Sequence, residues 1–543
     1  MLGQAPGILL TYFAEAVLIT LLGSVVLLRW YRGAVMRGMR AQPVAAAAAF
    51  APTDQASTVV PTDPAAILAS SRTRSRIRLI LVYGMAGCVA AAVLAKLFLV
   101  VLGGPSNGLR AFVTWYIYCW PLVPTYVALL ALPRKSALWL LAGYVAVGAA
   151  IVLAWSLVSL LITPEAQSTP LGNVLSYLAF LALEATVPFL IVVVVSSKPL
   201  RSVSAFLLAG LLVFSFSNLA VTHWLALSLD YPALSLVLPW LGAGMYLVSW
   251  YMLAALPIGY LCWRLLGWLS RVHERKGFSD VQLVVDSWWL ISVFFVMSSL
   301  ASDLGWGALA ALLALVAYRA IVTLGLRLAP TRSTGGRRLL LLRVFGFQRR
   351  TERLFDGIAQ RWRLLGSVRL IAAADLATRI VDPADVIAFV GGRMRERFVA
   401  GEADLGRHLE RMDDAPDPDG RFRVNKFFCH DDTWQPLLRA LLERSDAVLF
   451  DLRGFSPANS GCRYELGELS RTGLLPRTVM VVDESTDLDH LQAVLAVAMP
   501  GSGPAGIAGE PGGMAPIERV RPRSASDMER VRRRLAEVAG MRS

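Results

Sequence analysis

The distribution of hydrophobic residues divides the chain into two parts. Residues 1–326 hold almost all of the long apolar runs, whereas residues 327–543 alternate short apolar runs with polar, Arg-rich stretches. A transmembrane helix needs about 20 mostly apolar residues. Nine segments meet this requirement, near residues 8–28, 79–101, 111–132, 137–162, 174–195, 203–227, 238–263, 281–301 and 305–325. We therefore expect an α-helical polytopic membrane domain over residues 1–330.

Basic residues mark every second connection between these segments. They occur within residues 29–78, 133–136, 196–202 and 264–280, whereas the other connections hold a single basic residue, Arg110. Because cytoplasmic connections are enriched in Lys and Arg, we expect a multi-pass protein of the cell (inner) membrane with its N-terminus outside. The first segment lacks a basic n-region, which favours an anchor over a cleaved signal peptide.

The functional candidates among the charged residues inside the predicted spans are Glu15, Lys96, Glu184 and Asp286. Ionisable side chains are costly inside a bilayer and are functional candidates for that reason. One interpretation is that they form polar contacts between helices, with Glu15 and Lys96 pairing if the first two helices pack together. The other is that they line a path for an ion or solute.

The second part of the chain has the pattern of a soluble α/β domain. Short apolar runs predict strands at residues 339–345, 368–374, 422–428, 447–451 and 478–482. Amphipathic stretches between them predict helices at residues 351–365, 384–399, 433–444, 462–471 and 488–498. This alternation predicts a doubly wound parallel sheet over residues 331–500, which the charge pattern assigns to the cytoplasm.

Three further segments complete the expected organisation. The acidic insert at residues 402–420 predicts a turn-rich surface loop, and the Gly/Pro-rich residues 501–515 predict a flexible linker. Residues 516–543 predict a C-terminal strand and a basic amphipathic helix. The apolar face of this helix either packs on the domain or rests on anionic lipid.

Composition agrees with a membrane protein. Hydrophobic residues make up 56% of the 543 residues, above the roughly 45–50% of soluble proteins. The net charge of +14 comes partly from arginines that flank the spans, so we expect no nucleic-acid partner. The five cysteines have no zinc-ligand spacing, and we expect no metal site.

Polar and aromatic residues follow three of the predicted strands. Because the carboxyl ends of parallel strands meet at one edge of a sheet, we expect these residues to share a ligand site there. The candidates for ligand binding are Phe345, Gly346 and Arg349 after the first strand, His430, Asp431 and Trp434 after the third, and Asp451, Arg453, Ser456, Asn459, Gly461 and Cys462 after the fourth.

Glu465 is the candidate for catalysis. It lies about one turn into the helix that follows the strand at residues 447–451. A carboxylate at this position can attack or stabilise an oxocarbenium-like anomeric carbon. The alternative interpretation is that Glu465 is an exposed helix residue, stabilised near the helix N-terminus.

Residues 459–467 read Asn-Ser-Gly-Cys-Arg-Tyr-Glu-Leu-Gly. This stretch resembles the Asp-Ser-Gly-Thr-x-x-Glu-x-Gly motif of nucleoside 2-deoxyribosyltransferases, and TIR domains place a glutamate on the equivalent helix. The resemblance extends over about residues 331–500 in the order of elements. It implies that Glu465 is the glycosidic nucleophile or stabiliser and that Gly461 and Cys462 line the ribose pocket. It also implies NAD or a related nucleotide as ligand and a homo-oligomeric state. Asn459 and Cys462 stand where the transferases carry Asp and Thr.

Three functions follow as hypotheses. The first is a membrane-anchored effector or sensor that binds a nucleotide and cleaves its N-glycosidic bond with Glu465. The second is a non-catalytic module that binds a ligand or protein and signals through the membrane domain. The third is a transporter or channel regulated by its soluble domain.

Overall fold

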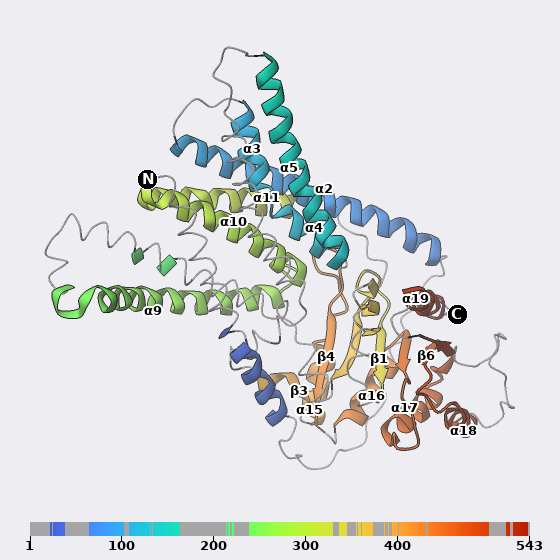
Figure 1. Cartoon of the computed structure of the whole chain (residues 1–543). Helices are drawn as coiled ribbons and strands as arrows, with labels where there is room; N and C mark the ends of the chain where they lie inside the picture. Colours follow the sequence, from blue (N-terminus) through green and yellow to red (C-terminus); the bar gives the residue numbers. More distant parts are fainter. Residues whose placement is uncertain are drawn as a thin grey trace. The chain divides into compact units, whose positions relative to one another are not determined.

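The computed structural model describes most of residues 22–38, 64–102, 108–162, 238–328, 336–344, 354–372, 394–498, 517–521 and 525–540, with isolated positions at 213–221 and 385–392. The chain forms two compact units (Figure 1). The first contains Met1–Arg29, Arg76–Pro330 and Asp382–Ile387, and the second contains Trp30–Ser75, Thr331–Val381 and Ala388–Ser543.

The first unit is helical. Its described elements are α2 (Pro64–Leu102) from Arg76 onward, α3 (Gly108–Tyr118), α4 (Leu122–Leu130), α5 (Arg134–Ile162), α9 (Leu238–Glu274), α10 (Asp280–Leu304), the 3-10 helix η2 (Gly305–Ala311) and α11 (Leu312–Arg327). Within the described residues, five helical segments are long and apolar enough to cross a membrane. They are Ile77–Val101, Ala111–Leu130, Lys135–Ala154, Val248–Glu274 and Gly305–Arg327.

These five segments agree with a membrane protein, and each overlaps one of the nine predicted spans. The predicted spans at residues 8–28, 174–195 and 203–227 lie wholly or largely outside the described residues. The predicted span at residues 281–301 lies within α10, a helix of 25 residues.

Small residues allow close helix packing in the first unit. A side chain at Gly84 would clash with Tyr126 of α4, and one at Gly87 would clash with Leu122 of α4 and Trp289 of α10. Arg78, at the start of the α2 span, donates a hydrogen bond of 2.6 Å to the carbonyl oxygen of Leu326. It thereby satisfies a backbone acceptor at the C-terminal end of α11, which the helix itself leaves open.

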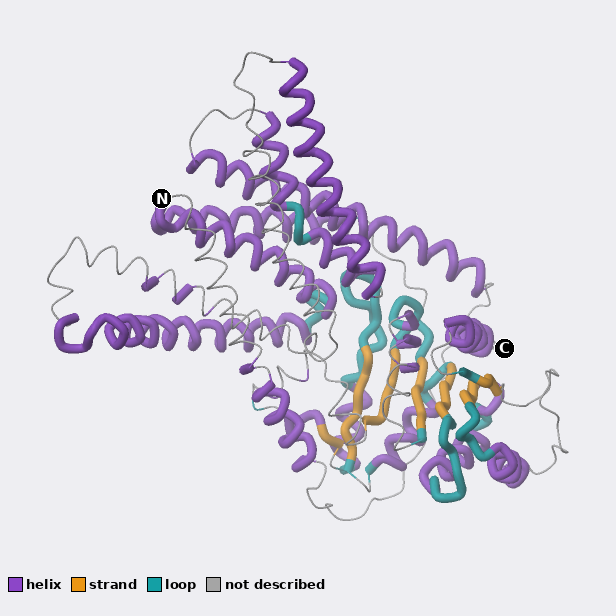
Figure 2. Tube along the Cα trace, in the orientation of Figure 1, coloured by secondary structure: helices purple, strands orange, loops and turns teal. Residues whose placement is uncertain are grey.

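The second unit contains a seven-stranded sheet in the order β3-β4-β2-β1-β5-β6-β7 (Figure 2). Its strands are β1 (Leu339–Arg343), β2 (Val368–Ala372), β3 (Phe398–Val399), β4 (Val424–Cys429), β5 (Ala447–Asp451), β6 (Thr478–Val482) and β7 (Ile517–Arg519). All neighbouring pairs are parallel. The predicted parallel α/β sheet is therefore confirmed.

One predicted helix is only partly correct. Residues 384–399 end in the 3-10 helix η3 (Met394–Arg397) and the short strand β3, in which Phe398 and Val399 pair with Phe428 and Cys429 of β4. A run of two bulky apolar residues, Phe398 and Val399, is too short to distinguish a helix from a strand by its pattern. Pairing with β4 makes this run a strand.

Alternate strand residues pack on opposite faces of the sheet. Leu340, Leu342 and Phe450 lie in the core with α15 (Glu402–Glu410), α16 (Trp434–Glu443), α17 (Ser460–Arg471) and α18 (Leu488–Ala498). Leu339, Leu341 and Leu449 lie in a second core with the stretch 354–362 and with α19 (Ala525–Gly540). The apolar face of α19, with Val531 and Leu535, is buried there. Packing of this helix on the domain, the first of the two alternatives, is confirmed.

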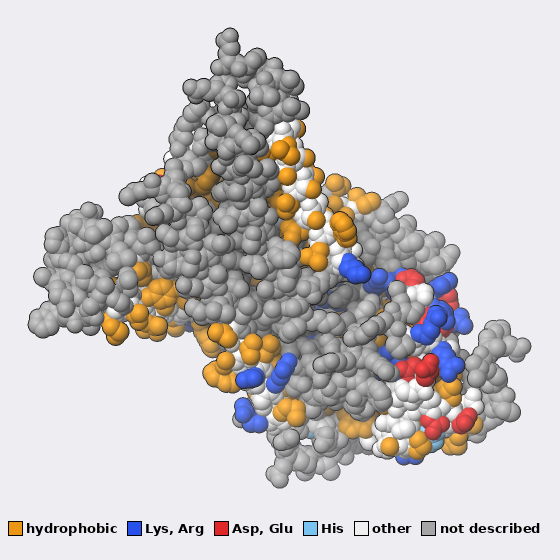
Figure 3. Space-filling model, viewed as in Figure 1, with side chains coloured by type: hydrophobic (Ala, Val, Ile, Leu, Met, Phe, Trp, Pro, Cys, Tyr) orange, Lys and Arg blue, Asp and Glu red, His pale blue; other side chains and the backbone are white. Residues whose placement is uncertain are grey.

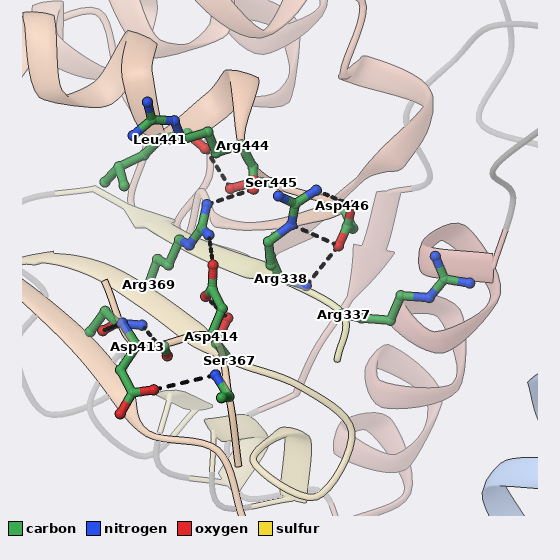
Figure 4. Close-up of polar contacts among 12 residues, drawn as sticks. Arg337, Arg338, Ser367, Arg369, Asp413, Asp414, Leu441, Arg444, Ser445 and Asp446 are labelled. Carbon is green, nitrogen blue, oxygen red and sulfur yellow. Dashed lines mark hydrogen bonds and ion pairs between the residues drawn. The ribbon is translucent and has the colours of Figure 1, made fainter. Parts of the chain in front are cut away.

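The acidic insert is only in part the expected turn-rich surface loop: residues 411–420 are turns and irregular chain, but they are anchored to the folded domain. Its first half is α15, and Asp417 and Asp419 are 3% and 4% exposed. Figure 4 shows how arginines bind the segment: the fully buried Arg369 of β2 pairs with Asp414 at 2.7 Å and donates to the carbonyl oxygen of Arg444 at 2.5 Å. A buried guanidinium needs such partners, which is why the acidic residues are held against the amino ends of the strands.

Candidate functional site

The sheet order creates a topological switch point between β1 and β5. The chain passes from β1 to β2 on one side of β1, and later returns to place β5 on its other side. Arg343 and Asp451, the last residues of these two strands, lie opposite each other in register. Open α/β sheets bind ligands at the carboxyl ends of strands at such a point.

Glu465 lies on α17, the helix that follows β5, and is buried with 4% exposure. The interpretation that it is an exposed helix residue is therefore wrong. Its Oε2 atom is enclosed and has no hydrogen-bond partner in the described part of the chain. Burial raises the pKa of this carboxyl group to about 8, and the positive charge of Arg343 opposes part of that rise. Glu465 is thus mainly protonated at neutral pH, and an additional positive charge nearby favours its carboxylate form.

Arg343 is a functional candidate that the sequence analysis missed. It is the last residue of β1, is 3% exposed, and interacts electrostatically with both Glu465 and Cys462. The signal in the sequence is an arginine at the end of four consecutive leucines. A cation at the end of a buried strand is costly unless it faces anionic groups.

Asp451 and Arg453 bind each other in the loop after β5. The guanidinium donates Nε to Oδ1 and Nη2 to Oδ2 of Asp451, both at 2.7 Å. The two residues are 1% and 7% exposed. A bidentate pair of this kind fixes the loop above the strand ends. If Asp451 bound a ribose or Arg453 bound a phosphate, the same side chain would also have to keep its partner in the ion pair.

Asp483, after β6, is the second residue that the sequence analysis missed. It is 5% exposed, accepts a hydrogen bond from the backbone N–H of Ser485 at 2.9 Å, and interacts electrostatically with Arg453. Its signal is an acid directly after a strand, as for Asp451. The site thus holds two aspartates, Asp451 and Asp483, and two arginines, Arg343 and Arg453. Their formal charges cancel when Glu465 is protonated.

Ser456 and Asn459 close the turn that leads into α17. The side-chain carbonyl of Asn459 accepts hydrogen bonds from the backbone N–H of Ser456 at 2.9 Å and from its hydroxyl at 3.0 Å. Gly461 is half-buried at the start of the helix. Cys462 is 1% exposed, and its thiol contacts the carbonyl oxygen of Arg343 at 3.8 Å. Burial raises the pKa of this thiol, which disfavours the thiolate needed of a nucleophile.

His430 and Trp434 lie at the same edge of the sheet but on the β4 side. The His430 ring stacks on Phe398 with centroids 5.8 Å apart, and Trp434 meets Tyr464 of α17 edge-on at 5.4 Å. Since β2 lies between β4 and β1, His430 lies on the β3 side of this edge, away from the β1/β5 switch point. Trp434 approaches the residue next to Glu465.

Six of the predicted residues lie outside the described part of the chain: Phe345, Gly346, Arg349, Asp431, Glu15 and Glu184. Of the other intramembrane candidates, Lys96 is exposed on α2, and Asp286 of α10 forms an ion pair with Arg319 of α11. Among the residues that the structure describes, no three His, Cys, Asp or Glu side chains gather in a group that could hold a metal.

The site thus consists of a buried carboxylic acid, a neighbouring buried arginine and a fixed ion pair at the switch point of the sheet. Comparisons of the chain with protein-family models, with curated proteins and with solved structures found no match.

Proposed function

We propose that this chain is a membrane-anchored protein whose α/β unit binds a nucleotide at the β1/β5 switch point and cleaves its N-glycosidic bond with Glu465. The observation that supports this most is the enclosed Glu465 carboxyl group, with one oxygen that has no hydrogen-bond partner in the described part of the chain, beside Arg343. Perturbed, buried carboxyl groups at such positions are typical of functional sites. NAD or a related nucleotide is the ligand class that the motif at residues 459–467 suggests.

The chemistry requires the carboxylate form of Glu465. A nucleotide with a positively charged base delivers a cation to the site, so Glu465 loses its proton on binding. The bond between the anomeric carbon and the base nitrogen then breaks, and its electron pair goes to the nitrogen. The Glu465 carboxylate stabilises or attacks the resulting oxocarbenium-like carbon, and water completes the hydrolysis with release of a proton.

The direct test is release of nicotinamide from NAD by the full chain in lipid nanodiscs. We expect Glu465→Gln, which keeps the shape of the side chain, to lower the rate by about 100-fold or more. Glu468→Gln is the matched control, because Glu468 lies on the same helix and pairs with Arg439 and Arg471 instead. Equal rates in the wild type and in Glu465→Gln would disprove the proposal.

A second candidate function is a sensor that binds the nucleotide without cleaving it. The pairing of Arg453 with Asp451 and the protonated state of Glu465 favour it, because neither group is free for catalysis before a ligand arrives. Thermal stabilisation of the full chain by NAD without nicotinamide release would support the sensor over the enzyme.

The proposed setting is the inner membrane, with the N-terminus outside and the α/β unit in the cytoplasm. The arginines at both ends of the connection at residues 29–78 support this orientation.

A further inference from the structure

The helix that leaves the first predicted span continues without a break over residues 25–38. In Figure 1 it is the blue helix beside β3. Tyr31 and Val35 are fully buried, and they lie four residues apart on one face of this helix. Residues from Trp30 onward belong to the same compact unit as the sheet. The inner face of the helix is therefore an integral part of the α/β unit.

Two contacts join this inner face to the β3 side of the sheet. The ring of Tyr31 meets Phe389 edge-on, with centroids 5.7 Å apart. Gly38 lies directly against the ring of Phe398 in β3, where an added Cβ would come within 2.7 Å of the ring. Phe398 in turn stacks on His430 at the carboxyl edge. Because β3 is the edge strand, the helix packs where the sheet would otherwise be open.

The outer face of the same helix is apolar at its beginning and basic towards its end. Leu22, Val25, Val26 and Trp30 are between 45% and 66% exposed. Arg29 and Arg37 are also exposed, and no acidic residue occurs between Glu15 and Asp54. Figure 3 shows this patch of orange and blue side chains over the helix. Tryptophan favours the membrane interface, and arginine is attracted to anionic headgroups.

We propose that residues 29–38 form a clamp between the α/β unit and an anionic lipid surface. Tyr31, Val35 and Gly38 hold the unit, and Arg29, Trp30 and Arg37 contact lipid headgroups. The partner is a bilayer surface because the exposed patch combines positive charge with an interfacial tryptophan and continues an apolar segment. The clamp is independent of any activity at Glu465.

Hydrogen exchange of the full chain in nanodiscs tests the lipid contact. Residues 25–40 are expected to exchange about fivefold more slowly in discs that contain phosphatidylglycerol than in discs of phosphatidylcholine alone. The double variant Arg29→Gln, Arg37→Gln should lose this difference. The control Arg411→Gln, Arg533→Gln removes two exposed charges elsewhere and should retain it. Equal exchange of the wild type in both lipids would overturn the proposal.

A second pair of variants tests the contact with the sheet. Tyr31→Ala should speed exchange in residues 394–399 and 428–433 by about tenfold, because it removes the ring that packs on Phe389. Trp30→Ala, a change at the neighbouring exposed residue, should leave this exchange unchanged. If Tyr31→Ala does not fold, Gly38→Ala provides a smaller disturbance of the same contact. Wild-type exchange at β3 and β4 in both the Tyr31 and Gly38 variants would rule out the clamp.

Discussion

At the scale of single residues, Glu465 makes stability depend on pH. Its pKa rises from 4.5 in the unfolded chain to about 8 in the folded protein. As pH rises through this window, the Glu465 carboxyl group ionises in the unfolded chain before it ionises in the folded protein. Ionisation therefore stabilises the unfolded state relative to the folded state. The free energy of unfolding should therefore fall between about pH 4.5 and pH 8, by roughly 4–5 kcal/mol from this group alone.

Glu465→Gln removes this dependence because the amide does not ionise. We expect the variant to melt at a higher temperature than the wild type at pH 8, and at nearly the same temperature at pH 5. Thermal melting of the full chain in detergent at both values measures the difference. If the variant is less stable than the wild type at pH 8, the carboxyl group is not held in its neutral form.

Gly366 allows two backbone segments to touch. A Cβ at this position would overlap the backbone of Arg337, just before β1. Gly366→Ala must therefore displace one of the segments, and we expect it to cost about 2 kcal/mol or more of stability. Gly406→Ala is the control, because a Cβ there meets nothing within 4 Å, and it lies inside α15. That change should be neutral or stabilising. The melting temperatures of the two variants and the wild type measure both effects.

At the scale of elements, the acidic segment after α15 is expected to stabilise the domain through Arg369. Asp414→Ala leaves this fully buried guanidinium without its carboxylate partner. We expect a loss of about 1–3 kcal/mol, since an uncompensated buried charge is costly. Asp404→Ala removes a more exposed pair with Arg407 on α15 and should change stability by less than about 1 kcal/mol. Equal losses would mean that the Arg369 pair has no structural role.

The elements themselves were largely predictable because buried parallel strands read as continuous apolar runs. Five predicted strands coincide with β1, β2, β4, β5 and β6. The errors occur where tertiary contacts override local pattern. The strand β3 exists through its pairing with β4, and Asp417 is buried because Arg423 pairs with it at 2.8 Å. The local sequence reveals neither the pairing of β3 with β4 nor the burial of the Asp417–Arg423 pair.

The candidate site was likewise predictable where it depends on local sequence, and not where it depends on which strands are neighbours. Asp451 and Glu465 were predictable from their places after a strand and on the following helix. The mutual pairing of Asp451 with Arg453, the burial of Arg343 and the charge of Asp483 depend on which strands become neighbours. Chain order alone does not reveal that β1 and β5 are adjacent, and this adjacency defines the switch point.

At the scale of the whole molecule, one contact constrains the number of membrane crossings. Tyr31 packs against Phe389 within one unit, so these residues lie on the same side of any bilayer. The chain between them must therefore cross the membrane an even number of times. All five candidate segments found among the described residues lie between them. The eight spans predicted after residue 38 are an even number and would satisfy this condition.

Labelling of single cysteines in an otherwise cysteine-free chain tests this topology. With the N-terminus outside, Ser106→Cys should react with an impermeant maleimide on intact cells. Ala48→Cys and Ser502→Cys should react only after lysis, because the basic connection and the α/β unit share the cytoplasmic side. If all three patterns are reversed, the orientation is wrong but the even number of crossings stands. If Ala48→Cys and Ser502→Cys label from opposite sides, the packing of Tyr31 on Phe389 cannot exist, and the clamp fails with it.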